Sequence, residues 1–334
     1  MQTQAISYHS NWHARLLEYM KKVYPHRDIR YLDWWITNID QSDEKCWEKC
    51  IIILYDDEII GCTTVNDARI LIDSEEKRFF SRGNTIVSPD QRGKGISKEI
   101  YNQVNLYDNW FSVGVTDIAW KIQPKYVKRF TPIRPVNVYI SVNWSICTQL
   151  FRKVYGGQPA TCQYPEHLSV SHFEELQKVS NISQIAFPSQ GQWMKDKAEI
   201  VRDKVFFLKR YYDIYNSDKY TIYQYLLRGK SIGYVVVRPT RYKGVEMLSL
   251  VDYRFQSRQD EVKAFKAAAK IAKSNNKGLV ITLSSREYTF RLLPLTIKMK
   301  KKLNCAIGMP KYKECFNDML ITSADSDLDF VYYR

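Results

Sequence analysis

Asn84-Thr-Ile-Val-Ser-Pro-Asp-Gln-Arg-Gly-Lys-Gly-Ile-Ser97 is the stretch of this sequence that decides the fold. Its β-branched run Thr85–Val87 predicts a strand, because such side chains pack well on a pleated surface. After the glycines come apolar residues at helical spacing, Ile96, Ile100 and Val104. A strand, a glycine turn and a helix N-terminus predict an anion site, since the first-turn N–H groups have no helical partner and the helix dipole is positive there.

The order of the glycines separates this loop from two common anion loops. Neither the dinucleotide fingerprint G-x-G-x-x-G nor the P-loop G-x-x-x-x-G-K-[ST] is present in the stretch. It resembles motif A of the GCN5-related N-acetyltransferases (GNAT superfamily), V-x-P-x-x-R-G-x-G-I, whose acyl-CoA loop is [R/Q]-x-x-G-x-[G/A]. Here the loop reads Arg92-x-x-Gly95-x-Ser97, so that Ser replaces the final Gly or Ala and adds a hydroxyl near the phosphates.

The resemblance implies an N-acetyltransferase that uses acetyl-CoA as acyl donor. It places the donor at the end of the motif A strand and along the loop, at Ile86, Val87, Arg92, Gly93, Lys94, Gly95, Ile96 and Ser97. A backbone N–H near Val87 would then stabilise the tetrahedral oxyanion.

The segments around this stretch follow the order of a GNAT core. Two apolar runs, Cys50–Tyr55 and Ile59–Val65, flank an Asp-Asp turn and predict a hairpin. A strand at 110–115, a helix capped by Thr116 and reaching about residue 130, and a strand at 135–140 are similar to motif B.

In that family the motif B helix often carries a Tyr that protonates the leaving thiolate. Counting from Ala119 puts Gln123 at that place, and Gln cannot act as an acid near neutral pH. Tyr126 or a water could take the role, or the domain is not catalytic in the usual way.

The second half repeats the order of the first, which predicts a second GNAT-like fold. We expect a hairpin at 220–237, a strand at 247–252, a helix at 262–272, a strand at 279–283, a helix at 287–302 and a strand at 319–322. In the connecting segment before the second half we expect a helix at 172–179. Where a phosphate loop would lie, Tyr253–Asp260 has no glycine, which disfavours close approach of a pyrophosphate. The second half is therefore predicted not to bind CoA.

The predicted fold class is α/β (α+β), with two GNAT-like units, each a mixed, mostly antiparallel sheet flanked by helices. Residues 1–157 form the domain with the acyl-CoA loop, 158–190 connect, and 191–334 form a degenerate domain that recognises the acceptor. The whole chain resembles tandem GNAT proteins of bacteria. Three segments resemble acetyltransferases encoded with surface-polysaccharide genes: Tyr31–Trp35, Phe207–Tyr212 and Asp325–Asp329.

The net charge of +14 indicates an anionic partner. Nucleic acid is possible but not favoured, because no helix-turn-helix, zinc-finger, RRM or KH signature accompanies the charge. The densest basic run, Lys298–Lys302, is most simply a solvated helix end. The predicted acceptor is a primary amine, that of an amino sugar or of a nucleotide-linked amino sugar, and we expect it to be anionic.

Cysteine usage and hydropathy predict a cytoplasmic protein. Seven cysteines, an odd number, favour reduced thiols over a disulfide framework. No apolar run approaches the ~20 residues that span a bilayer, and the N-terminus lacks a signal-peptide pattern. Cys46 and Cys50 have no second pair at zinc spacing, so no metal is expected.

Two residues are candidates for the base that deprotonates the amine. Asn84 lies on the motif A strand, where many GNATs carry Glu; it does not titrate, so it would orient a water. Asp252 ends a predicted strand of the second half and could face the cleft between the units, although a strand-end turn former is the simpler interpretation. Two other functions stay open: a Fem-like aminoacyl transferase that uses charged tRNA, and a non-catalytic binding protein.

Overall fold

Two units fold from interleaved pieces of the chain. The computed structural model describes residues 3–37, 50–107, 109–147, 164–185, 197–213, 218–242, 245–288 and 295–325. Unit 1 comprises Met1–Arg134 and Asn304–Asn317, and unit 2 comprises Pro135–Leu303 and Asp318–Arg334. These boundaries do not coincide with the continuous segments 1–157, 158–190 and 191–334 expected from the sequence.

Unit 1 is built on a sheet with the strand order β1-β2-β3-β4-β5-β14. Its strands are β1 (Gln4–Ser7), β2 (Cys50–Tyr55), β3 (Glu58–Ile72), β4 (Glu75–Val87), β5 (Trp110–Val115) and the end of β14 (Thr296–Ile307). Only β4 and β5 run parallel; the other neighbours are antiparallel. The predicted hairpin around the Asp-Asp turn is β2–β3.

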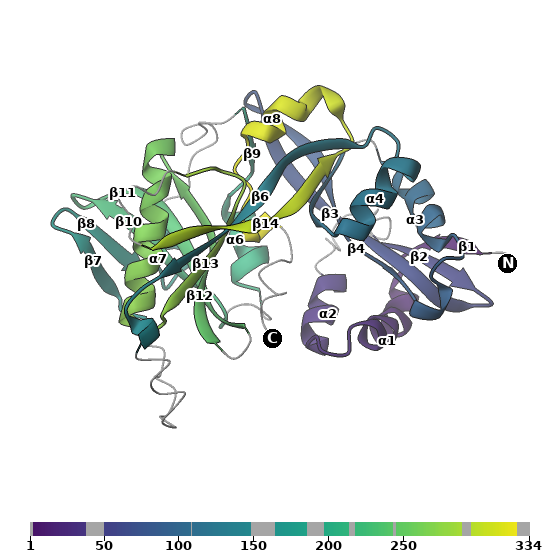
Figure 1. The fold of residues 1–334 in the computed structure, drawn as a ribbon, viewed down its shortest axis with the longest axis horizontal. Coiled ribbons are helices and arrows are strands. Elements are labelled where there is room, and N and C mark those ends of the chain that lie inside the picture. Colours follow the sequence, from purple (N-terminus) through teal and green to yellow (C-terminus); the bar gives the residue numbers. More distant parts are fainter. Residues whose placement is uncertain are drawn as a thin grey trace. The chain divides into compact units, whose positions relative to one another are not determined.

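Helices cover both faces of this sheet. They are α1 (His13–Val23), α2 (Ile29–Thr37), α3 (Ile96–Val104), α4 (Asp117–Tyr126) and α8 (Lys313–Asp318). In Figure 1, α3 and α4 lie on the opposite side of the sheet from α1 and α2. The hydroxyl of Thr116 caps α4 as predicted, accepting from the N–H of Ala119 at 3.3 Å, but the helix ends earlier than expected, at Tyr126.

Unit 2 has a sheet with the order β6-β13-β12-β11-β10-β8-β7, in which only β12 and β13 are parallel. The strands are β6 (Thr131–Val142), β7 (His167–Ser171), β8 (Glu174–Lys178), β10 (Thr221–Leu227), β11 (Lys230–Tyr242), β12 (Val245–Phe255) and β13 (Leu279–Ser284). The short β9 (Ala198–Ile200), α6 (Lys204–Tyr211) and α7 (Lys263–Ser274) complete the elements.

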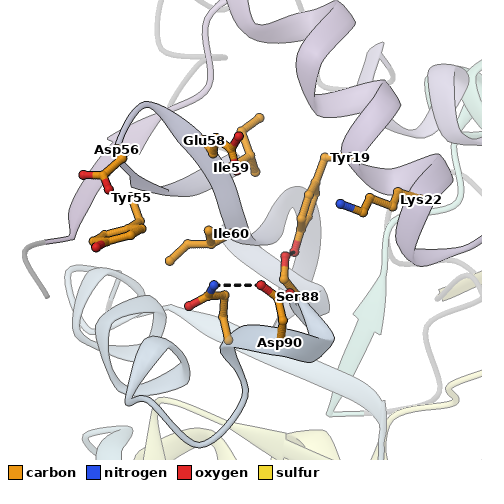
Figure 2. A pocket seen from close by; sticks show the side chains of 10 residues that line it. Tyr19, Lys22, Tyr55, Asp56, Glu58, Ile59, Ile60, Ser88 and Asp90 are labelled. Carbon is orange, nitrogen blue, oxygen red and sulfur yellow. Dashed lines mark hydrogen bonds between the residues drawn. The ribbon is translucent and has the colours of Figure 1, made fainter.

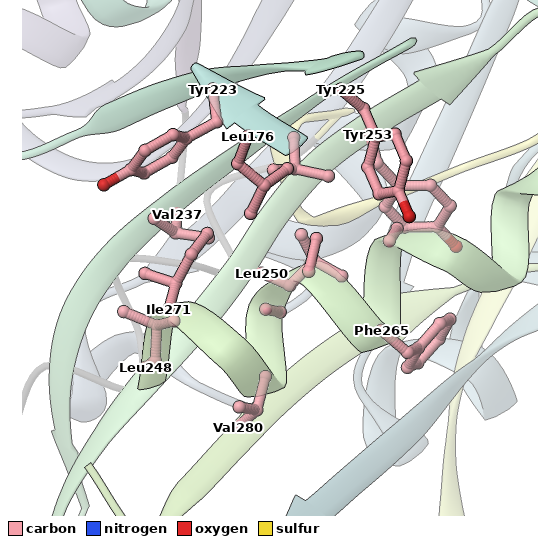
Figure 3. Close-up of a cluster of buried hydrophobic side chains, with 14 of the residues drawn as sticks. Leu176, Tyr223, Tyr225, Val237, Leu248, Leu250, Tyr253, Phe265, Ile271 and Val280 are labelled. Carbon is pink, nitrogen blue, oxygen red and sulfur yellow. The ribbon is translucent and has the colours of Figure 1, made fainter. Parts of the chain in front are cut away.

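The core of unit 2 lies between α7 and the sheet (Figure 3). Ala264 and Ala268 are fully buried, so the helix backbone can approach the strands closely. Leu248 and Leu250 of β12 and Phe265 of α7 fill the interface. The architecture is therefore a mixed, mostly antiparallel α/β fold flanked by helices, as the sequence predicts.

Three predicted elements are wrong, and long-range strand pairing explains two of them. Residues 174–178 form β8 rather than a helix, because they pair with both β7 and β10. Residues 296–302 belong to β14, so the basic run Lys298–Lys302 lies on a strand with exposed side chains. The expected strand at 319–322 is reduced to a single bridge between Ser284 and Thr322. Tertiary pairing overrides local propensity at such positions.

Candidate functional site

A bulge interrupts β4 just before the glycine loop. Between Gly83 and Ile86, β4 has one more residue than the paired segment of β3. Asn84 takes up this extra residue with a left-handed backbone, φ 48°. The hydroxyl of Thr63 supports the bulge: it donates to the carbonyl of Gly83 at 3.1 Å and lies 3.0 Å from the hydroxyl of Thr85. Bulges of this kind bend a strand and re-aim its side chains.

The pairing of β4 with β5 ends early. The ladder consists of two residue pairs, Phe80 with Trp110 and Ser81 with Phe111. Beyond them, in the part of the chain that the structure describes, no strand pairs with the β5-facing edge of residues 82–87, which we call the open β4 edge. An extended group that carries amides can bind such an edge as an additional strand does.

The glycine loop presents free N–H groups at the start of α3. Gly93 (φ 81°) and Gly95 (φ 86°) have backbones that other residues adopt only with strain, and a Cβ on either would meet no atom within 4 Å. Within the described residues, the N–H groups of Gly93, Gly95, Ile96 and Ser97 donate to no other group. Convergent N–H groups at a helix N-terminus bind phosphate, so the loop fits a pyrophosphate.

Gly61 of β3 sets the position of this helix. A Cβ there would lie 3.0 Å from Cγ2 of Ile96 and 3.4 Å from Cδ1 of Ile100. The absence of a side chain therefore lets α3 pack closely on the strands. Both isoleucines are buried against β2 and β3, so Ile96 offers its backbone N–H and not its side chain to a ligand.

Two exposed cations flank the free N–H groups. The Nε of Arg92 donates to the carbonyl of Val87 at 3.4 Å, and the Nζ of Lys94 donates to Oε1 of Gln91 at 3.2 Å. Neither cation pairs with a carboxylate among the residues that the structure describes. Both can therefore contribute charge-assisted hydrogen bonds to an anion bound at the loop.

A cavity of about 350 Å³ lies beside the loop, between α1, the β2–β3 turn and the end of β4 (Figure 2). Its lining residues are Tyr19, Lys22, Tyr55, Asp56, Glu58, Ile59, Ile60, Ser88, Asp90 and Gln91. Three carboxylates face one ammonium, so the cavity disfavours phosphate. A hydrogen bond from Gln91, 2.7 Å long, lowers the pKa of Asp90 and keeps it ionised. The cavity suits a neutral or cationic group.

Gln123, at the place where the resemblance puts a catalytic Tyr, is a buried structural contact. Its Oε1 accepts from Nη2 of Arg82 at 2.6 Å. Arg82, which the sequence analysis did not single out, lies at the inner end of the open β4 edge. The one available signal was its position two residues after Phe80 on β4, which puts a charged side chain on the helix-facing side of a strand. Tyr126, the alternative acid, ends α4 and is 39% exposed.

The two catalytic candidates have different surroundings. Asn84 forms the bulge at the open β4 edge. Asp252 is not at a strand end: it lies within β12, fully buried in unit 2, 2.9 Å from Nε of Arg202 and 3.0 Å from Nη1 of Arg254. Burial alone would raise the pKa of Asp252, but the two arginines outweigh it and hold that pKa below its usual value. These ion pairs account for a buried carboxylate without a catalytic role.

The structure thus brings together the residues that the sequence assigned to the donor, from Ile86 to Ser97, at one strand–turn–helix junction of unit 1. Among the described residues, no group of three His, Cys, Asp or Glu side chains could hold a metal ion. No helix in the described segments has the length and apolar character needed to cross a membrane.

Solved structures with similar folds are acyltransferases by name. No protein-family model and no curated protein matches the chain. A GCN5-related N-acetyltransferase from Anabaena variabilis aligns with a TM-score of 0.58 at 14% identity, over 92% of this chain and 72% of that one. A probable N-acyltransferase of unknown function from Enterococcus faecalis gives 0.55 at 12% identity, over 92% and 72%. A Saccharomyces cerevisiae N-myristoyltransferase with bound myristoyl-CoA gives 0.55 at 13% identity, over 91% and 80%.

These alignments cover both units, and identities of this size describe the fold alone. The chain therefore has the fold of the GCN5-related N-acetyltransferases.

Proposed function

We propose that this protein transfers an acyl group from acyl-CoA, with acetyl-CoA as the donor, to the primary amine of an amino sugar. The observation that carries the proposal is the set of four N–H groups, from Gly93 to Ser97, that have no acceptor in the described chain and lie next to the open β4 edge. An anion followed by an extended amide chain fits this arrangement, and CoA has both parts.

Different residues of the site would bind different parts of the donor. The N–H groups of the loop would hold the pyrophosphate, with Arg92 and Lys94 adding charge. The two amides of the pantetheine arm would hydrogen-bond the open β4 edge, along Ile86 and Val87. Asn84, at the bulge, would orient a water that takes the proton of the attacking amine. Names of the similar structures, N-acetyltransferase and N-myristoyltransferase, support acyl transfer to an amine.

We assign acceptor recognition to the second GNAT-like unit, in an arrangement of the tandem type. Unit 2 has no glycine between β12 and α7, so it offers no second CoA loop. The resemblance to tandem acetyltransferases of bacterial surface-polysaccharide synthesis supports a sugar acceptor. The net charge of +14 supports an anionic one, such as a nucleotide-linked amino sugar in the cytoplasm.

Thermal unfolding with and without acetyl-CoA tests the proposal. A ligand at 100 times its Kd should add about 2.7 kcal/mol to the free energy of unfolding. Gly95→Trp should abolish this gain, because the side chain covers the free N–H groups. Gly229→Trp is the matched control: Gly229 has φ 76° and open space around it, but it lies in the β10–β11 turn of unit 2.

The outcomes separate the alternatives. A gain in wild type and Gly229→Trp, but not in Gly95→Trp, supports the site, and thiol release with a panel of amino sugars then identifies the acceptor. Protection by aminoacyl-tRNA instead of acetyl-CoA would support the aminoacyl transferase. Protection by acetyl-CoA without thiol release from any amine would leave a binding protein. No protection of the wild type by acetyl-CoA contradicts the proposal.

A further inference from the structure

Arg82 is a buried cation without a buried anion. Its side chain is 4% exposed, and its contacts are neutral: Nε donates to Oγ of Ser112 at 3.2 Å, and Nη2 donates to Gln123. The guanidinium also lies 4.2 Å from the centre of the Trp110 ring. Within the described residues no carboxylate pairs with it, and Nη1 has no hydrogen-bond partner at all.

Such an arrangement is costly unless a ligand completes it. A buried charge normally has a partner of opposite sign, because removal from water is unfavourable. Burial lowers the pKa of Arg82 to about 10, with Tyr101 acting in the opposite direction, so the guanidinium is still charged at neutral pH. Perturbed and unpaired groups of this kind occur at functional sites.

The position of Arg82 on the strand indicates which part of a ligand reaches it. Arg82 lies one residue past the last β4–β5 pair, at the inner end of the open β4 edge. Val87, where the edge ends at the glycine loop, is five positions further along the strand, and at ~3.3 Å per residue this is roughly 16 Å. An extended phosphopantetheine arm has this reach, so phosphates at the loop put the sulfur near Arg82. The thioester carbonyl oxygen is bonded to the same carbon as the sulfur, so this placement puts the oxyanion near Arg82 and not near Val87, where the sequence resemblance placed it.

We propose that Nη1 of Arg82 contacts the sulfur of the bound donor and stabilises the CoA thiolate as it leaves. This inference rests on the proposed function. It assigns to Arg82 the stabilisation of the leaving thiolate, which Gln123 cannot provide because it is not an acid. Gln123 is a positioning residue: by accepting from Nη2 it leaves Nη1 for the ligand.

The reaction balances without a proton from Arg82. The amine nitrogen attacks the thioester carbon, and the carbonyl electrons move to oxygen. When they return, the carbon–sulfur bond breaks and its electron pair stays on sulfur as a thiolate beside the guanidinium. The extra proton of the nitrogen passes to water, and the thiolate takes a proton from water after CoA is released. Arg82 acts through its charge.

Binding of CoA and of desulfo-CoA, which lacks the thiol, tests this without any acceptor. An ordinary thiol titrates near ~8.5. If the cation lowers the pKa of the bound thiol, the affinity for CoA must rise with pH between the bound and the free pKa, whereas that for desulfo-CoA must not. A one-unit shift gives about a tenfold gain in the ratio of the two affinities, and the ultraviolet absorbance of the thiolate reports the same titration directly.

Substitutions at positions 82 and 123 test whether Arg82 causes this pH-dependent gain in affinity. Arg82→Gln should remove the tenfold gain while both ligands still bind through the loop, and Arg82→Lys should retain part of it. Gln123→Glu gives the guanidinium a carboxylate and should also suppress the gain, which a merely structural role of residue 123 would not do.

Each result is decisive. Equal pH dependence of CoA and desulfo-CoA binding in wild type would overturn the inference and leave the proposed function standing, and this comparison needs no variant to fold. Failure of both ligands to bind wild type would instead contradict the proposed function.

Discussion

The two units build the same strand–turn–helix element and complete its helix N-terminus in opposite ways. In unit 1 the turn after β4 contains Gly93 and Gly95, and the first N–H groups of α3 have no acceptor in the described chain. In unit 2 the turn after β12 contains Asp260 and Glu261 in a 3-10 turn ahead of α7. In this turn the N–H groups of Gln259, Asp260 and Lys263 are already bonded, to Ser257 and to carbonyls of the turn itself.

Glu261 of this turn is held by hydrogen bonds to other side chains of unit 2. Its Oε2 accepts from Tyr288 at 3.0 Å and from Nε of Arg286 at 3.3 Å, and the residue is 7% exposed. Both units thus have a helix dipole at this place, but only in unit 1 do the glycines leave N–H groups without an acceptor in the described chain, so only there can an anion use them.

The two catalytic candidates also occupy matching places. Asn84 and Asp252 each lie three residues before the residue that faces a β-strand glycine, Gly61 in unit 1 and Gly233 in unit 2. One forms a bulge at an open edge, and the other is the centre of a buried ion cluster. At equivalent positions, one unit thus has a bulge beside an unpaired strand edge that a ligand can reach, and the other has a buried carboxylate that pairs with arginines.

The largest expected effect comes from removing the central anion of unit 2. Asp252→Asn removes the carboxylate that Arg202 and Arg254 share and should destabilise the protein by roughly 3–5 kcal/mol in urea unfolding. Asp325 and Glu199 still pair with the two arginines, so the loss comes from the ion pairs and hydrogen bonds of Asp252 itself. Asp57→Asn is the control: it breaks an exposed pair with Arg15 and should cost at most about 1 kcal/mol.

The pH dependence of this loss has a defined sign. The pKa of Asp252 is lower in the folded state, so its contribution is present above its unfolded value, about 3.9, and is lost as pH falls through the folded pKa. Equal stability losses in the two variants would show that the cluster does not hold unit 2 together.

The next effect compares the two strand glycines. A Cβ on Gly233 would lie 2.6 Å from the carbonyl oxygen of Arg254, a backbone atom, whereas one on Gly61 meets the side chain of Ile96 at 3.0 Å. Gly233→Ala should therefore cost about 1–3 kcal/mol of stability, and Gly61→Ala less. Gly61→Ala should instead weaken acetyl-CoA binding, because α3 moves. A larger loss of stability in Gly61→Ala would contradict this assignment.

A carboxylate placed inside the glycine loop should oppose an anion bound there. Lys94→Glu puts an acid beside the free N–H groups and should weaken acetyl-CoA binding by about tenfold, or ~1.4 kcal/mol. Titration calorimetry at low and high salt measures this, since screening should reduce the effect. Lys121→Glu on α4 makes the same charge change outside the loop. An equal loss of affinity in that variant would show that the net charge of the protein, and not the charge at the loop, determines the effect.

The smallest effect tests whether the backbone or the side chain binds at the end of the loop. Ser97 replaces the Gly or Ala of the resembling motif, but its N–H is free in either case. Ser97→Ala should change the affinity for acetyl-CoA by less than about 0.5 kcal/mol, the range of substitutions that remove no essential contact. A tenfold loss in calorimetry would assign the hydroxyl a direct phosphate contact.

Residues close together in the sequence predicted the glycine loop. The features that the sequence did not predict depend on contacts between residues far apart in the sequence. The glycines, the β-branched run and the helix spacing lie within 21 residues, so their pattern is readable. Residues 174–178 pair with the adjacent β7 and with the distant β10, and residues 296–302 with strands far along the chain; propensity cannot supply such pairing. The contact between Arg82 and Gln123 joins residues 41 apart and gives no local signal.

The placement of Asp252 failed for a related reason. The sequence ends a strand there because charged residues follow, but Arg254 is buried with it, 3.0 Å away. Two charged residues can be buried in the core when they pair with each other. A hydropathy pattern treats each residue separately, so it does not predict such a pair.

The interleaving of the units has a consequence for synthesis of the chain on the ribosome. Residues Asn304–Ile307 pair with β5, and the Phe316 ring centre lies 5.2 Å from that of Phe79, so the sheet and core of unit 1 are incomplete until residues 304–316 have emerged. Contacts between residues so distant in sequence close slowly. We expect nascent unit 1 to stay unfinished, and open to chaperones, until residues 304–316 have been synthesised, rather than folding first as an independent N-terminal domain would.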